Sequence, residues 1–257
     1  MTRRRVTSAA LGLCLISVFV RAGAAQTGDL TVLSSTGLRA VMEVLVPRFE
    51  KAKGRKVTVK YDTAAALKQQ IDGGASFDVA VLTPPLMDDV IKQGKIAADS
   101  RAVIAETGMG LAIRAGAPRP DMSTTEAFKR TLLGAKSITY TKQGASGVYF
   151  AGLIDRLGIA DQLKPKIKLV ATADEVGEAV ASGAAELGAL PVSEILPIHG
   201  AELGGTFPAD VQTHIVMVAG VSASTKQGSA ARDLIKSLTA PAALPVIKDK
   251  GMELVVR

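Results

Sequence analysis

Short apolar runs with the character of strands alternate with helical segments near the start of the chain, and this alternation limits the possible folds. Residues 29–33, 56–60 and 77–82 read as three strands. Between them, apolar residues recur at helical spacing in residues 38–53 and 64–72. A repeated strand–helix order is typical of a parallel sheet covered by helices. The first third of the chain is therefore predicted to form an α/β unit.

The alternation resumes after residue 108 and predicts a second α/β unit. The later elements are expected as strands at residues 109–114, 137–140, 168–171, 187–190 and 213–221, with helices between them and at 226–238 and 241–249. Because the final helices can return to the first unit, we expect an α/β fold of two lobes, with parallel-rich sheets flanked by helices and a hinge of crossing strands. Residues 26–108 then form the first part of lobe 1, residues 109–217 form lobe 2, and residues 218–257 return to lobe 1.

Two residues within these predicted elements, a proline and a histidine, carry expectations of their own. Pro47 falls inside the first predicted helix and is expected to kink or divide it, because proline lacks an N–H and its ring collides with the preceding turn. His214 stands in the apolar strand at 213–221, where we expect it to be packed or capped rather than catalytic.

The N-terminus has the pattern of an export signal. Basic residues 3–5 precede a run of twelve mostly apolar residues at 9–20, and small residues 22–24 satisfy a cleavage pattern. Twelve residues are too few to span a membrane, which takes about 20. Cys14, the single cysteine, lies inside this run, so the processed chain has no disulfide. Residues 1–25 are predicted to be a cleaved signal peptide, and the protein is predicted to be periplasmic.

The charge pattern argues against a nucleic-acid partner. Of the 31 basic residues, four lie in the first 25 residues, which contain no acid, so the rest of the chain is close to neutral. Tryptophan is absent and aromatic residues make up 4% of the chain, which disfavours stacking on sugars.

Three predicted strand-to-helix turns carry hydroxyls and glycines. They lie at residues 34–37, 62–64 and 144–147. Helix N-termini present free N–H groups and a partial positive charge, so these turns could bind an anion at the carboxyl ends of the strands. The same residue types are also ordinary helix caps. The candidate ligand-binding residues of these turns are Ser35, Thr36, Gly37, Thr63, Ala64, Ser146 and Gly147.

Arg39 is a further candidate, because a cation is locally unfavourable in the first turn of a helix. It either contacts an anionic ligand in the cleft or pairs with Glu43, one turn along the same helix.

Motifs of common enzyme classes are absent from the sequence. It contains no G-x-S-x-G, no Walker A run, no G-x-G-x-x-G after a strand and no H-E-x-x-H. His199 lies in an expected surface turn, and no pair of nucleophile and base is visible. We therefore predict a protein that is not an enzyme and uses no cofactor or metal.

Several stretches of this sequence resemble a known family, the periplasmic molybdate-binding proteins, which are type 2 solute-binding proteins of ABC importers. The stretches that carry the resemblance are residues 30–38, 47–54, 65–75, 77–79, 144–149 and 186–190. The resemblance covers essentially the whole processed chain. It implies a monomer of two α/β lobes that closes on an oxyanion between helix N-termini and delivers it to an inner-membrane ABC permease.

The resemblance carries over unevenly to individual ligand positions. The backbone amides near Ser146 and Val176 match those of the family. Gly37, Ala64 and Pro191 stand where the family has a serine, a second serine and a tyrosine. The expected function is delivery of a small, molybdate-like anion to an ABC importer. Binding of an organic carboxylate, or a ligand-sensing role, remains an open alternative.

Overall fold

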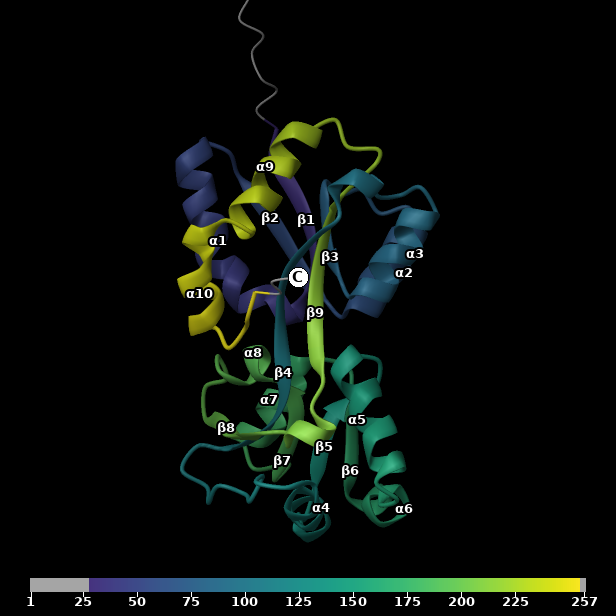
Figure 1. Cartoon of the computed structure of the whole chain (residues 1–257), viewed down its shortest axis with the longest axis vertical. Helices are drawn as coiled ribbons and strands as arrows, with labels where there is room; N and C mark the ends of the chain where they lie inside the picture. Colours follow the sequence, from purple (N-terminus) through teal and green to yellow (C-terminus); the bar gives the residue numbers. More distant parts are fainter. Residues whose placement is uncertain (1–27, 255–257) are drawn as a thin grey trace, which may run out of the picture.

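Two long strands run between the two halves of the molecule and join them (Figure 1). In the computed structural model, which describes residues 28–254, they are β4 (Ala102–Arg114) and β9 (His214–Val221). They pair antiparallel over residues 102–108 of β4. From Met109 onward, β4 changes partners and pairs with strands of the other half. The predicted signal peptide at residues 1–25 lies outside the described residues.

Lobe 1 contains one end of this shared strand pair. Its strand order is β2-β1-β3-β9-β4, in which the first three strands are parallel and β9 is antiparallel to its neighbours. The three parallel strands are β1 (Leu30–Ser35), β2 (Val57–Asp62) and β3 (Val79–Leu82). Helices α1 (Arg39–Lys53), α9 (Gly228–Leu238) and α10 (Leu244–Asp249) cover one face, and α2 (Ala64–Asp72) and α3 (Pro84–Lys92) cover the other (Figure 1).

Side chains on the two faces of the lobe 1 strands pack into two separate cores. Leu30 and Val32 of β1 pack in the core that includes residues of α1 and α9, whereas Leu33 packs in the core under α2 and α3. Strands buried on both faces appear in the sequence as nearly continuous apolar runs, as in residues 79–82 of β3.

Lobe 2 repeats the three-layer arrangement. Its strands are β5 (Ile138–Thr141), β6 (Ile167–Val170), β7 (Leu187–Pro191) and β8 (Ala201–Thr206). β5 is parallel to β6 and β7, and β4 is antiparallel to β7 and β8. One core includes residues of α4 (Thr125–Gly134), α5 (Ala145–Arg156) and α6 (Ala160–Leu163), and another includes residues of α7 (Ala173–Ala181) and α8 (Val192–Ile195).

The two-lobed α/β fold is confirmed, whereas three local predictions are wrong and one strand was not predicted. Helix α1 is continuous through Pro47, which lies on the exposed face where solvent can hydrate the carbonyl that proline leaves unpaired. β4 begins at Ala102 rather than at residue 109, and β8 was not predicted. His214 is exposed at the start of β9 rather than packed.

The assignment of chain segments to lobes stays a prediction. The boundaries expected at residues 108 and 217 both fall inside the crossing strands β4 and β9. Within residues 28–254, no helix combines the length and apolar character needed to cross a membrane.

Candidate functional site

A small chamber rich in hydroxyl groups lies at the carboxyl ends of the strands and is lined by residues of both lobes. Its volume is about 30 Å³, and we call it the inner chamber. Six hydroxyl-bearing residues and Glu194 line it, together with small or apolar residues, namely Ala64, Gly144, Ala145, Ala173, Pro191, Ile215 and Met217. The six are Ser35, Thr36, Thr63, Thr83, Thr141 and Ser146. Hydroxyls both donate and accept hydrogen bonds, so this lining suits an anionic oxygen.

Helix N-termini add positive potential to the inner chamber. Helix α2 begins after Thr63, whose side chain accepts a hydrogen bond from the N–H of Ala66 at 3.2 Å. Helix α5 begins after Gly144, which brings no side-chain acceptor to its first turn. First-turn N–H groups without a capping side chain are available to a bound anion.

Thr141, at the end of β5, is a chamber residue that the sequence analysis missed. It is 3% exposed, and its Oγ1 is buried without a hydrogen-bond partner among the described residues. A Cβ on Gly147 would lie only 1.7 Å from the Thr141 carbonyl oxygen, so α5 can pack here only with glycine at that position. A buried hydroxyl left unpaired costs about 1–3 kcal/mol, and an acceptor on a ligand would remove that cost.

The predicted site residues fall into four groups, one of which is Arg39, in the outer cavity described below. Five of them line the inner chamber, namely Ser35, Thr36, Thr63, Ala64 and Ser146. Gly37 and Gly147 are buried behind this lining, against Met217 and Thr141 respectively. Val176 lines neither cavity of the cleft, because its side chain lies in a lobe 2 core and its N–H donates to the Thr172 carbonyl at 3.3 Å.

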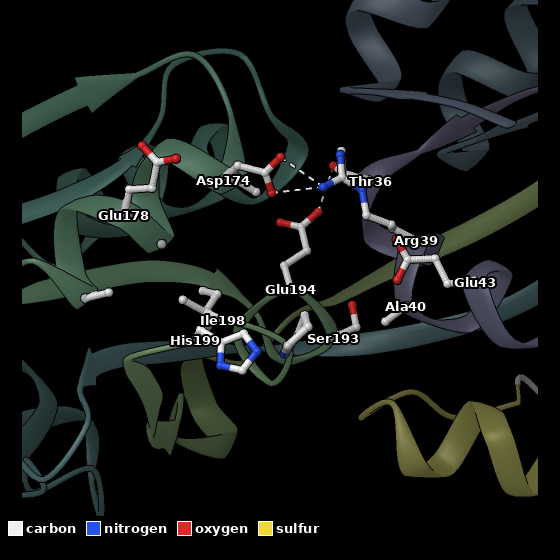
Figure 2. Close-up of a pocket in the computed structure, with 14 residues that line it drawn as sticks. Thr36, Arg39, Ala40, Glu43, Asp174, Glu178, Ser193, Glu194, Ile198 and His199 are labelled. Carbon is white, nitrogen blue, oxygen red and sulfur yellow. Dashed lines mark hydrogen bonds and ion pairs between the residues drawn. The ribbon is translucent and has the colours of Figure 1, made fainter.

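A larger cavity of about 470 Å³, which we call the outer cavity, adjoins the inner chamber (Figure 2). The two spaces share three lining residues, Thr36, Ala173 and Glu194, so these residues stand at the boundary between them. The outer cavity also contains charged groups, with Arg39 and Glu43 from α1 and Asp174 and Glu178 from α7.

Three polar contacts hold the lobes together at this boundary. Thr36 Oγ1 donates to Glu194 Oε1 at 2.9 Å, and Ser193 Oγ donates to the Gly37 carbonyl at 3.0 Å. Arg39 Nη1 donates to both carboxylate oxygens of Asp174, at 2.9 and 3.0 Å (Figure 2). Each contact joins the start of α1 or the turn before it to a lobe 2 helix, so the cleft is closed in this structure.

Arg39 therefore has a partner that neither sequence alternative named. Its ion pair is with Asp174 of the opposite lobe rather than with Glu43. The guanidinium also lies over the Tyr61 ring, 5.0 Å from the ring centroid. Its Nε is buried with no hydrogen-bond partner among residues 28–254. The arginine thus lies in the outer cavity with part of its donor capacity unused.

Glu194 is the second residue that sequence reasoning missed. Removal from water raises its pKa from 4.5 to about 7, and the nearby charge of Asp174 acts in the same direction. The Thr36 hydrogen bond and the Arg39 charge oppose this rise. Near neutral pH the carboxyl group therefore exists in both forms and can either give or take a proton. Its hydrogen-bond partner is 158 residues away, so no local sequence pattern pointed to it.

Two α/β lobes with crossing strands and a polar cleft between them define the architecture of a solute-binding protein. Residues 30–253 match the family model described as "Bacterial extracellular solute-binding protein", and the chain belongs to this family.

Two curated relatives match nearly the whole chain. An aconitate isomerase of Pseudomonas sp. is 30% identical over 255 residues, covering 97% of each chain. The molybdate-binding protein ModA of Azotobacter vinelandii is 27% identical, covering 89% of this chain and 91% of the relative. The solved Azotobacter vinelandii periplasmic molybdate-binding protein superposes with a TM-score of 0.77 at 23% identity, covering 89% of this chain and all of that one.

Proposed function

We propose that this chain is an exported solute-binding protein whose cleft closes on a small organic anion with two or more carboxylates. The observation that carries the proposal is the position of Thr36 and Glu194, between a chamber of hydroxyls and helix N-termini and a cavity that contains Arg39. A ligand longer than a compact oxyanion reaches past these two residues, from the inner chamber into the outer cavity.

The inner chamber supplies donors for one carboxylate. The Thr141 hydroxyl lacks a protein partner among the described residues, and the first turn of α5 carries no side-chain cap. Ser35 and Ser146 are both 5% exposed and line the same space. Hydrogen bonds from such groups to a charged acceptor contribute about 1.5–3 kcal/mol each.

Arg39 supplies a cation for a second carboxylate. Its present partner, Asp174, has a side chain that is 64% exposed. Ion pairs of this kind contribute only about 0–1 kcal/mol, so a ligand carboxylate can replace Asp174 at little cost. Arginine is well suited to this exchange, because its planar guanidinium binds carboxylates in a bidentate manner.

Molybdate is the less favoured ligand because the chamber lacks donors at three positions. Gly37, Ala64 and Pro191 bring no side-chain donor, and Pro191 brings no N–H either. A dianion enclosed with too few donors is strongly destabilised.

The partner and location belong to the same proposal. Delivery to an inner-membrane ABC permease, after removal of residues 1–25 in the periplasm, agrees with the family and with the periplasmic protein that superposes on this chain. The alternative is a role as a ligand-sensing module. Growth of a deletion strain on the ligand as sole carbon source distinguishes the two roles, because an importer component is needed for uptake.

Calorimetry and thermal melting of the purified protein test the choice of ligand. The panel comprises citrate, cis- and trans-aconitate, succinate, molybdate, tungstate and sulfate. At about 100 times Kd a bound ligand stabilises the protein by about 2.7 kcal/mol, which raises Tm by roughly 5–10 °C for a chain of this size. We expect this shift with a tricarboxylate and a smaller shift with molybdate. Nanomolar molybdate binding without any carboxylate response would refute the proposal.

A second candidate function is isomerisation of an unsaturated polycarboxylate. The observation that favours it is Glu194, an acid in the cleft whose pKa of about 7 suits proton transfer at neutral pH. The Pseudomonas relative named aconitate isomerase supports the same activity, because it matches this chain from end to end. Proton NMR of cis-aconitate incubated with the protein tests it through the appearance of the trans isomer.

A further inference from the structure

We propose that Glu194 is the catalytic residue that carries a proton between two carbons of a bound unsaturated polycarboxylate, with Thr36 as its positioning residue. This inference rests on the second candidate function above, and it adds the reacting group and its place in the cleft.

The position of Glu194 separates it from the other acids of the cleft. Among the described residues, Glu43, Asp174 and Glu178 line the outer cavity only, whereas Glu194 lines both the outer cavity and the inner chamber. A ligand held by one carboxylate in the chamber and another at Arg39 has its carbon chain at the boundary between the two spaces. Glu194 is the acid that faces that boundary.

Thr36 holds the carboxyl group in place. Its hydroxyl donates to Glu194 Oε1 at 2.9 Å, from the turn that opens α1 in the opposite lobe. A carboxylate has lone pairs for further partners, so this bond fixes its direction and leaves the other oxygen free to take a proton. Because the bond spans the two lobes, the base is oriented only when the cleft is closed.

The charges around Glu194 suit a group that must both accept and donate a proton. Asp174 on α7 acts on Glu194 as a negative charge, and Arg39 on α1 acts as a positive one. Glu43, Glu178 and His199 complete the titratable groups of the outer cavity. Burial and the Asp174 charge raise the pKa of Glu194, and the Thr36 hydrogen bond and the Arg39 charge lower it. With a pKa of about 7, both protonation states are populated near neutral pH, as general acid–base catalysis requires.

The reaction balances without an oxidant, a reductant or a second substrate. The Glu194 carboxylate takes a proton from the saturated CH₂ carbon of propene-1,2,3-tricarboxylate, and the electron pair of that C–H bond spreads over the three-carbon unit and its carboxylates. The resulting carboxylic acid returns the proton to the opposite end of the unit. The double bond moves by one carbon, and its new geometry is cis or trans.

The same cleft stabilises the charge that develops during this step. As the C–H bond breaks, negative charge builds up on the ligand carboxylates, which lie against the hydroxyls and helix N-termini of the inner chamber and against Arg39. Donors fixed in advance at the position of developing charge lower the barrier to proton abstraction.

The experiment compares Glu194→Gln, Glu194→Asp and a control, Glu202→Gln, in the full protein. Glu202 lies on β8 and lines neither cavity. Isomerisation of cis-aconitate is followed by NMR in D₂O, and its binding is measured by calorimetry. We expect Glu194→Gln to lose at least about 100-fold in kcat and to stop deuterium entry into the ligand, while Kd changes by less than about 10-fold. Glu194→Asp, which keeps the carboxylate, should retain an intermediate rate, and the control should match the unaltered protein.

The outcomes separate this inference from the function on which it rests. Isomerisation at an unchanged rate in Glu194→Gln overturns the role of Glu194 and leaves the isomerase function standing. Binding of aconitate without any isomerisation by the unaltered protein overturns the inference and leaves carboxylate binding standing. No binding of any carboxylate removes the proposed function, and the inference with it.

Discussion

Gly147 is the position where a single methyl group tests the architecture of the inner chamber. In Gly147→Ala the new Cβ would lie 1.7 Å from the Thr141 carbonyl oxygen and 2.8 Å from both the carbonyl carbon and Oγ1 of the same residue. Two of these atoms belong to the backbone of β5 and cannot rotate away. The first turn of α5 must therefore move from the end of β5 by more than about 1 Å to restore ordinary contact distances.

The size of the effect follows from two opposing terms. Alanine is a better helix former than glycine by up to about 1 kcal/mol. Overpacking against fixed atoms costs about 1–3 kcal/mol or more, and contact with backbone favours the upper end. We expect a net loss of about 2 kcal/mol in the free energy of unfolding, which lowers Tm by roughly 4–8 °C. The displaced N–H groups also leave the chamber, so anion affinity should fall about 10-fold or more.

Gly152→Ala is the matched control, because Gly152 lies in the same helix. There the new Cβ would meet only the end of the flexible Arg156 side chain, at 3.4 Å. This variant should gain up to about 1 kcal/mol and melt a few degrees higher. Thermal melting by circular dichroism and calorimetry with citrate provide the measurements. If Gly147→Ala melts at or above the temperature of Gly152→Ala, the close approach of α5 to β5 is wrong.

Three further predictions concern the cleft. Thr141→Val removes an unpaired hydroxyl at nearly constant volume, so Tm without ligand should stay unchanged or rise. Calorimetry should show that citrate binds about 10-fold more weakly, and unchanged affinity would count against a ligand bond to Thr141. Arg39→Ala removes an ion pair worth at most about 1 kcal/mol and should shift Tm little. The variant should lose far more affinity for a tricarboxylate than for a monocarboxylate, and equal losses of affinity would contradict a second carboxylate site. Because the pKa of Glu194 is raised from 4.5 to about 7, the native state holds the proton more tightly than the unfolded state does. The free energy of unfolding should therefore fall as pH rises from about 4.5 to about 7. Urea titrations measure this slope, and the same slope in Glu194→Gln would contradict the prediction.

The sequence predicted the architecture because apolar periodicity is a local property. The buried strands β1 and β3 and helix α2 all lie where their patterns indicated. β8 escaped prediction because its adjacent glycines, Gly204 and Gly205, have low strand propensity. It forms because β4 offers a free edge and because Ile113 and Met122 pack against those glycines.

The lining of the inner chamber was predicted in part, for a similar reason, whereas the ligand-binding role of these residues stays a prediction. Turns that carry hydroxyls at the ends of strands can be recognised locally, and Ser35, Thr63 and Ser146 do line one chamber. Glu194 and the partner of Arg39 could not be recognised, because Thr36–Glu194 and Arg39–Asp174 join residues 158 and 135 positions apart. Such pairs exist only once the lobes face each other.

The place of β9 in the lobe 1 sheet has a consequence for the order in which the chain can fold. β9 lies between β3 and β4, yet residues 214–221 follow most of the chain in sequence. Without them, β3 and β4 have no strand between them, and the helices α9 and α10 that complete the lobe 1 core are also missing. The N-terminal segment of lobe 1 therefore cannot complete its core alone. A chain truncated before residue 214 should remain sensitive to protease in its N-terminal half.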